Sequence, residues 1–243
     1  MGYFESRVPV DIENYDDLIN KLKFLRKLDF RNVILEPVNN IEKFPKKLIE
    51  KIRKTTDLNV FFRINLKPKN IAELKQLIKK YNNFSHILSV ESGDKEIQIY
   101  SARDTRIDVI SFSYPNITKT LTPGVLSLSK QYNSFIEFSL APIFNENKNI
   151  QSKNIRIIYS ALRKTLAKKA NYFISGNFSS LFDYRSPRVL ISICQTLLDI
   201  TLTNAKLALR ENPFKLIEKL NTKINPNIIE DGVKIIKQEK VGE

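Results

Sequence analysis

The chain has 243 residues, with 40 Lys and Arg against 26 Asp and Glu, which gives a formal net charge of +14. A hydrophobic fraction of 42% predicts a folded domain with a complete core, and the excess of positive charge favours a polyanionic partner. One cysteine and one histidine argue against a disulfide framework and a zinc or multinuclear metal centre. The sequence contains no apolar run of the roughly 18 residues that cross a bilayer and no signal-peptide pattern, so we expect a cytoplasmic protein without a membrane partner.

Strand patterns and helix patterns alternate along the first half of the chain. β-Branched and apolar runs predict strands in RVPVD, NVILEPV, VFFRINL, HILSVES, EIQIYSA and IDVISFS, with a turn at Gly93 and Asp94. Helical spacing of apolar residues predicts helices at residues 11–30, 44–55 and 70–81.

The second half continues this pattern. A short helix is expected around VLSLSKQYN, then the strand SFIEFSLAP, the long helix KNIRIIYSALRKTLAKKA and the strand NYFIS. Ser186 and Pro187 are a typical cap and first turn for the helix SPRVLISICQTLLD, where Cys194 is predicted to be a buried apolar residue rather than a nucleophile. Mostly helix follows, and the residues from 225 to 243 are expected to form a polar, flexible tail.

Repeated βα alternation predicts parallel strands with helices packed outside them. About eight strands in residues 1–224 favour a single α/β domain with a TIM-barrel-like fold, irregular where EIQIYSA and residues 113–133 interrupt the rhythm. A doubly wound open sheet is the alternative. It would normally carry a glycine-rich phosphate loop, and the sequence contains neither GxGxxG nor a P-loop, which disfavours a nucleotide cofactor.

Carboxylates near predicted strand ends are the candidates for catalysis: Glu36, Glu91, Asp104, Asp108 and Glu137. They could hold Mg²⁺, or they could cap helices and pair with neighbouring Arg or Lys. His86 adjoins an apolar run and is expected to be a strand-edge histidine with one hydrogen bond. We therefore expect no catalytic residue and no metal ligand in this chain.

Basic side chains gather at three predicted strand or helix ends, where loops of a barrel converge. A helix N-terminus also favours phosphate, and arginine grips phosphate oxygens bidentately. Each arginine could instead pair internally, with Asp104, Asp108 or Asp183. The predicted RNA contacts are Arg63, Lys67, Lys69, Arg103, Arg106, Arg185 and Arg188.

Four stretches carry a resemblance to a known family. NLKPKNIAELKQLIKKYNNFSHILSVES, ARDTRIDVISF, YFISGNFSSLFDYRSPRVL and NAKLALRENPFKLIEKL resemble, in this order and across about residues 30 to 220, the archaeal ribonuclease P protein component 3 family, homologous to the eukaryotic thirty-kilodalton subunit. The residues carried over are Arg103, Asp104, Arg106, Ser175, Gly176, Arg185, Ser186, Pro187 and Arg188.

The resemblance implies a TIM-barrel-like subunit of a ribonucleoprotein that removes 5′ leaders from precursor tRNA. The catalyst would be the RNA with Mg²⁺, and the chain would bind no cofactor itself. Its partners would be the ribonuclease P RNA and other protein subunits, especially a smaller dedicated one, with precursor tRNA contacted indirectly. The family is similar in fold to histidine-rich metal phosphoesterases, whose metal pattern this sequence lacks.

ARDTRIDVISF is thus expected to hold RNA or a partner, with Arg103 and Arg106 facing outward and Asp104 or Asp108 fixing their geometry. Ser175, Gly176, Ser186 and Pro187 are expected to be structural. One alternative is a standalone Mg²⁺ phosphoesterase that uses Glu91, Asp104 and Asp108. Another is a partner-binding module whose arginines are all paired internally.

Overall fold

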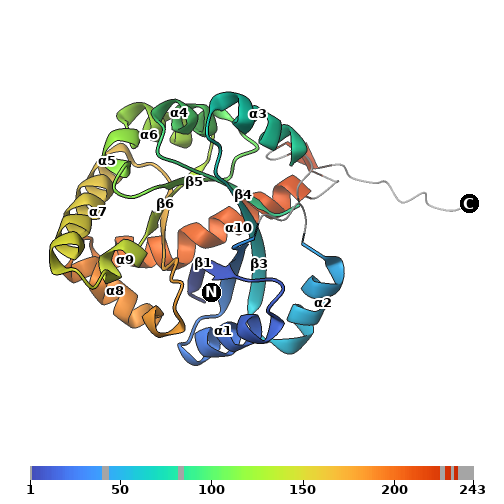
Figure 1. The fold of residues 1–243 in the computed structure, drawn as a ribbon. Coiled ribbons are helices and arrows are strands. Elements are labelled where there is room, and N and C mark those ends of the chain that lie inside the picture. Colours follow the sequence, from blue (N-terminus) through green and yellow to red (C-terminus); the bar gives the residue numbers. More distant parts are fainter. Residues whose placement is uncertain (1, 40–43, 82–84, 225–227, 231–232, 235–243) are drawn as a thin grey trace, which may run out of the picture.

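Seven parallel strands wrap into a nearly closed barrel surrounded by helices (Figure 1). The computed structural model describes residues 2–39, 44–81, 85–224, 228–230 and 233–234. The barrel strands are β1 (Phe4–Val10), β2 (Asn32–Pro37), β3 (Asn59–Leu66), β4 (Ile87–Ser92), β5 (Val109–Phe112), β6 (Phe135–Ser139) and β7 (Tyr172–Ser175).

Helices connect consecutive strands, as parallel pairing requires. They are α1 (Tyr15–Lys27), α2 (Lys46–Thr55), α3 (Ile71–Lys80), α4 (Lys95–Arg103), α5 (Ile117–Thr120), α6 (Pro123–Gln131), η1 (Ala141–Phe144) and α7 (Lys148–Lys168). After β7 follow η2 (Leu181–Asp183), α8 (Pro187–Thr196), α9 (Leu202–Lys206), the π-helical turn η3 (Leu207–Glu211) and α10 (Asn212–Ile224). No helix of the described residues has the length and apolar composition that a membrane crossing requires.

The strands follow one another in sequence order from β1 to β7, so the barrel prediction is confirmed and the doubly wound alternative is wrong. Closure between the first and last strands comes from the loop after β7, where Asn177 N donates to Arg7 O at 3.2 Å and Gly176 N donates to Glu5 Oε1 at 2.8 Å. In place of an eighth strand, η3 packs against both β7 and β1.

The segment EIQIYSA was expected to be a strand and instead forms most of α4. Asp94 is the N-cap of this helix rather than a turn residue, because its side chain accepts a hydrogen bond from Ile97 N at 2.9 Å. The alternation of isoleucine with polar residues resembled a strand because Gln98 is polar yet fully buried. Its amide donates to Ser92 O at 2.9 Å and Ser111 O at 2.7 Å, so it joins the ends of β4 and β5.

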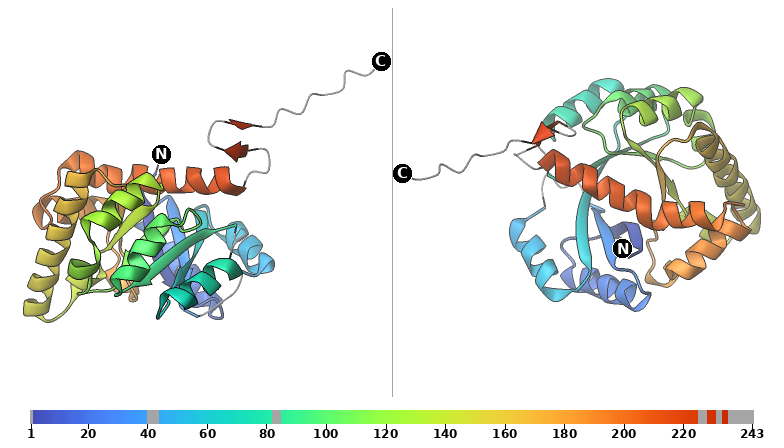
Figure 2. Two further views of the ribbon diagram at one scale, coloured as in Figure 1. Left: turned by 90° about the horizontal axis from the view of Figure 1, so that it is seen from above. Right: turned by 180° about the vertical axis from the view of Figure 1, so that it is seen from behind.

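Inside the barrel, the strand residues change from apolar to polar along the strand direction. Phe4, Ile34, Ile87, Val109, Phe135 and Phe173 form an apolar layer at the N-terminal end of the barrel, and Leu216, Ile217 and Leu220 of α10 pack against it. Figure 2 shows α10 lying across this end. Two residues further along β4, β5, β6 and β7, the same side of the sheet carries Ser89, Ser111, Glu137 and Ser175.

Two other expectations concern the cysteine and the C-terminal residues. Cys194 is buried, as expected, and burial raises the pKa of its thiol to about 12. After α10, the short strands β8 (Ile228–Glu230) and β9 (Val233–Lys234) pair antiparallel. The rest of the expected tail lies outside the described residues, so its flexibility stays a prediction.

Candidate nucleic-acid interface

Arg63 lies inside the barrel, and its side chain is only 1% exposed. Its guanidinium donates to Glu137 Oε2 at 2.9 Å and to Ser89 Oγ at 2.9 Å, and its Nε lies 2.9 Å from Glu36 Oε2. The prediction that Arg63 contacts RNA is therefore wrong, because the strand alternation turns this residue into the barrel, whereas Lys67 continues past the strand end.

A second interior arginine, Arg7, was not singled out from the sequence. Its Nη2 lies 2.7 Å from Glu36 Oε1 and 2.8 Å from Glu91 Oε2, and its Nη1 lies 3.6 Å from Glu137 Oε2. The available signal was the stretch FESRVPV, in which Glu5 and Arg7 are charged residues two apart in a strand.

The two arginines decide the ionisation of the interior glutamates. Burial alone would raise the pKa of Glu137, but the charges of Arg63 and Arg7 and the hydroxyl hydrogen bond from Ser111 lower it to about 2. Burial opposes ionisation at Glu91 as well, and Arg7 and Asn65 lower its pKa. The three glutamates of this layer thus serve as partners of two fixed guanidinium groups.

Glu5 differs from these glutamates because burial raises its pKa to about 8. Its carboxyl accepts the backbone N–H of Gly176, and a Cβ on Gly176 would lie 2.6 Å from Glu5 Oε2 and 2.5 Å from the ring of Phe178. A glycine is needed here because of this close approach. The neighbouring Ser175 donates to Glu137 Oε1 at 2.6 Å.

The arrangement does not assemble the Mg²⁺ site of the phosphoesterase alternative. Glu91 lies near the C-terminal end of β4, whereas Asp108 precedes β5, with its backbone N bonded to Leu88 O, and Asp104 pairs with Arg106. Expecting Asp108 at the C-terminal mouth was thus an error. Among the described residues, no three or more His, Cys, Asp or Glu side chains are grouped so as to hold a metal ion. His86 packs against the rings of Phe44 and Phe62, at centroid distances of 5.7 and 5.4 Å.

The stretch ARDTRIDVISF forms the corner between α4 and β5. Arg106 binds Asp104 through two nitrogens, Nε to Oδ1 at 2.8 Å and Nη2 to Oδ2 at 2.6 Å, and still leaves 40% of its side chain exposed. Partial burial would raise the pKa of Asp104, but these bonds lower it. Arg103, at the end of α4, is exposed to solvent. The corner thus presents one arginine in a fixed orientation beside another at the surface.

Asp108 fastens α10 to this corner. Its carboxylate accepts Leu88 N at 3.0 Å and lies 3.4 Å from Lys219 Nζ and 3.6 Å from Lys223 Nζ. Lys223 also donates to Arg106 O at 3.2 Å. The two lysines were not anticipated, although their spacing of four in EKLNTK, beside the apolar stripe of α10, indicates that they share a helix face.

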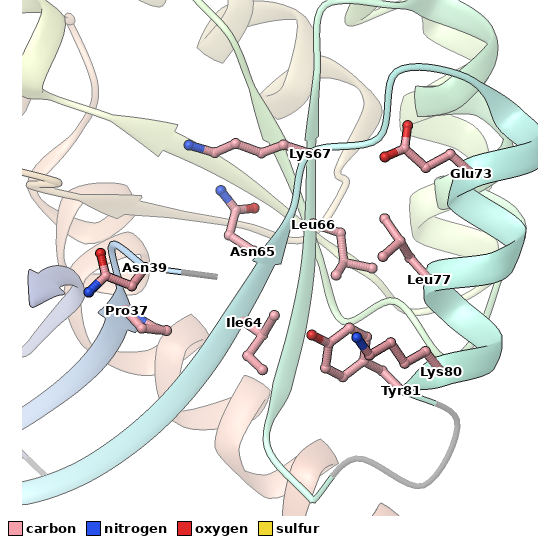
Figure 3. A pocket seen from close by; sticks show the side chains of 10 residues that line it. All are labelled: Pro37, Asn39, Ile64, Asn65, Leu66, Lys67, Glu73, Leu77, Lys80 and Tyr81. Carbon is pink, nitrogen blue, oxygen red and sulfur yellow. The ribbon is translucent and has the colours of Figure 1, made fainter. Parts of the chain in front are cut away.

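Lys67 and Lys69 lie at the opposite end of the barrel, after β3, and both are exposed. Lys67 lines a pocket of about 430 Å³ together with residues that include Asn65 and Tyr81. Figure 3 shows Asn65 and Lys67 extending from one side of β3 and Leu66 from the other, toward Leu77 of α3. Asn65 donates to Glu91 Oε2 at 2.8 Å, which connects this rim with the interior charges.

Arg185 and Arg188 have different surroundings although they are three residues apart. Arg185 donates to the carbonyls of Phe182 and Tyr184 at 2.5 and 3.0 Å and lies over the ring of Phe144, so it shapes the loop before α8. Arg188 is exposed. It lines a pocket with Ser186, Pro187, Tyr3, which precedes β1, and Lys27, Leu28 and Asp29 at the end of α1. Ser186 occupies the N-cap position, as expected, without a capping hydrogen bond from its side chain.

The basic clusters therefore do not converge on one mouth of the barrel. Arg103, Arg106 and Arg188 lie toward the N-terminal ends of the strands, whereas Lys67 and Lys69 lie at the C-terminal end. Two separate surfaces can contact an extended polyanion. The interior can neither reach such a ligand with Arg63 nor present a free catalytic carboxylate pair.

Comparison with known proteins adds a family and a set of relatives. A family model described as RNase P subunit p30 matches residues 2–225. Ribonuclease P protein component 3 of Methanocaldococcus jannaschii is 21% identical over 235 residues, which is 94% of this chain and 97% of that protein.

Solved structures share the fold. A chain in a cryo-EM structure of archaeal ribonuclease P with mature tRNA superposes with a TM-score of 0.79 at 18% identity, covering 98% of this chain and 99% of that one. A putative prolidase from Bifidobacterium longum gives a TM-score of 0.61 at 8% identity, covering 90% of this chain and 69% of that one.

Proposed function

Because the chain belongs to the RNase P subunit p30 family, we propose that it is a protein subunit of ribonuclease P, the ribonucleoprotein that removes the 5′ leader from precursor tRNA. The observation that carries the proposal is the extent of the family match, which spans every strand of the barrel and the helix α10 that covers its end. The named relative aligns over nearly its full length as well.

The proposed role is to bind and stabilise the catalytic RNA through exterior basic side chains. Contacts are assigned to Lys67, Lys69, Arg103, Arg106 and Arg188, which are exposed or half-exposed at the ends of strands and helices. Phosphate contacts of this kind position a protein on RNA without reading its sequence. Arg185 is assigned to shaping its loop, because it donates to two carbonyl oxygens there.

Cleavage is assigned to the RNA with Mg²⁺, and the chain is proposed to bind no cofactor itself. The support is the interior charge pairing, since Glu36, Glu91 and Glu137 already neutralise Arg7 and Arg63. The other protein subunits of the particle are the remaining partners. We place the particle in the cytoplasm, and a buried, unpaired Cys194 suits a reducing compartment.

Salt dependence of RNA binding tests this proposal. If the chain neutralises several phosphates of ribonuclease P RNA, the logarithm of its affinity falls linearly and steeply with the logarithm of salt concentration. Fluorescence anisotropy of labelled RNA at four or five salt concentrations gives the slope. A flat response would contradict the assignment of the basic surfaces to RNA.

A further inference from the structure

The outer face of α8 and the start of α9 expose apolar side chains. Val189 is 42% exposed, and Leu197 and Leu202 are each 44% exposed. Ile193 is half-buried on the same side of α8 as Val189, four residues away. The opposite side of the helix contributes its own apolar residues to the core, among them Leu190. We call the outer group Val189, Ile193, Leu197 and Leu202 the α8–α9 face.

This part of the chain has little charge, although 27% of all residues are Asp, Glu, Lys or Arg. Residues 189–205 contain one charged side chain, Asp199. The neighbouring helix α7 is the opposite, because its 21 residues include six Lys and Arg and no acidic residue. Figure 1 shows α7, α8 and α9 following one another around the outside of the barrel.

The two helices therefore suit different partners. A helix that faces RNA or water in this strongly basic protein carries lysines and arginines, as α7 does. Depletion of charge together with exposed aliphatic side chains is instead the mark of the centre of a protein interface. Within α8, the exposed polar residues Ser192, Gln195 and Thr196 can hydrogen-bond to a partner without the desolvation of a charge.

The charged residues around the α8–α9 face indicate which kind of partner it can bind. Arg188 is exposed directly before Val189, and Lys206 is half-exposed at the end of α9. Asp199 is also exposed, between Leu197 and Leu202, so the two basic residues give the surroundings of the face a net positive charge. Such a face complements an apolar surface whose rim is mainly acidic. We propose that the α8–α9 face binds another protein subunit of the ribonuclease P particle with such a surface. This inference rests on the proposed function and adds the location of the protein contact.

The test uses the full chain and the purified remaining protein subunits of the same particle, mixed one at a time without RNA. Val189→Glu places a charge in the centre of the face. Ile150→Glu is the matched control, because Ile150 is also the third residue of its helix and is 45% exposed, on the basic helix α7. Leu202→Glu is a second variant, at the first residue of α9, where a negative charge suits the helix N-terminus.

We expect wild type and Ile150→Glu to bind one subunit equally in size-exclusion and calorimetric measurements. Val189→Glu and Leu202→Glu should weaken that binding at least tenfold while their thermal midpoints stay unchanged, and Leu202→Glu, which lies away from Arg188 in sequence, should keep its affinity for ribonuclease P RNA. If Val189→Glu unfolds at a lower temperature than wild type, the subunit binding of Leu202→Glu alone tests the proposal.

Three results would overturn the proposal. Both face variants could bind the subunit as wild type does, Val189→Glu could lose RNA affinity and keep the subunit, or the wild-type chain could dimerise through this face. A wild-type chain that binds RNA but no subunit contradicts the interface alone. A wild-type chain that binds neither RNA nor a subunit contradicts the proposed function itself.

Discussion

Arg63 and Arg103 carry the same guanidinium group and lie in opposite environments. Arg63 is inside the barrel, bonded to Glu137 and paired with Glu36, whereas Arg103 is at the surface at the end of α4. The first holds the strands together through charges hidden from water, and the second is available to a polyanion. The net charge of the chain therefore overstates the number of its RNA contacts. We expect a substitution of Arg63 to lower stability and a substitution of Arg103 to lower RNA affinity.

The largest expected effect is on stability, from Arg63→Met. Losing Arg63 leaves the buried carboxylates of Glu36 and Glu137 with Arg7 as their remaining arginine partner, at a cost of about 3–5 kcal/mol. Urea unfolding followed by circular dichroism measures the free energy of unfolding. Arg103→Met is the control and should change it by less than about 0.5 kcal/mol. Equal free energies of unfolding for the two variants would contradict the structural role assigned to Arg63.

Asp108→Ala should have the next largest effect, because Asp108 accepts Leu88 N and pairs with Lys219 and Lys223 of α10. Leaving these groups without their buried partner costs roughly 1–3 kcal/mol. Asp104→Ala, which removes a half-exposed pair with Arg106, should cost less than about 1 kcal/mol. Thermal melts of both variants measure this order. A lower melting temperature for Asp104→Ala than for Asp108→Ala would show that the pair with Arg106 stabilises the fold more than the contacts of Asp108 with α10 do.

The interior charges also predict a dependence on pH. Glu5 has a pKa of about 8 in the folded chain against 4.5 as its ordinary value, so the unfolded chain loses this proton first as pH rises. Its contribution to stability is complete below pH 4.5 and declines up to about pH 8. Relative to wild type, Glu5→Gln should therefore gain stability across this window and level off above it. A constant difference between pH 5 and 8 would mean that Glu5 is ionised in the fold.

The contribution of Glu137 to stability changes with pH in the opposite direction to that of Glu5, and it does so at low pH. Its pKa is lowered from 4.5 to about 2, so its contribution is present above pH 4.5 and is lost as pH falls toward 2. Glu137→Gln should weaken the fold at pH 6 by more than at pH 2.5, as measured by urea unfolding at both values. The same loss at both would exclude the arginines as the source of the effect.

The smallest expected effects are on RNA affinity. Lys67→Ala, Lys69→Ala, Arg103→Ala and Arg188→Ala should each lower the salt slope of RNA binding by about one and leave the melting temperature unchanged. Arg185→Ala should instead lower the melting temperature with little change in slope, because Arg185 donates to Phe182 O and Tyr184 O. Early melting of Arg103→Ala with normal RNA binding would place that arginine among the structural ones.

The sequence was sufficient for the barrel and for most of its elements, since helical and strand periodicities report which side of an element is buried. It failed at EIQIYSA, because a buried glutamine looks like an exposed position until its carbonyl partners on β4 and β5 are known. It also failed at Arg63, where the same alternation of residues fits an arginine facing solvent or facing a barrel interior. Glu36 and Glu137, which decide the matter, are 27 and 74 residues away in sequence.

The site was predictable only in part for the same reason. ARDTRIDVISF correctly indicated a corner with exposed arginines, and Asp104 orients Arg106 there. Its link to α10 depends on Lys219 and Lys223, more than 100 residues further along the chain, which local patterns do not connect to Asp108. The spacing of the predicted strands in the sequence also does not show that Arg103 and Lys67 lie at opposite ends of the barrel.

The central claim is that this chain supports a catalytic RNA and performs no cleavage itself, and precursor tRNA cleavage tests it most directly. Reactions with Mg²⁺ contain the ribonuclease P RNA and remaining subunits with this chain, the same mixture without it, or this chain alone. We expect faster 5′ leader removal with the chain than without it, and intact precursor with the chain alone. Site-specific cleavage by the chain alone that survives removal of RNA and is abolished by Glu91→Gln would contradict the account.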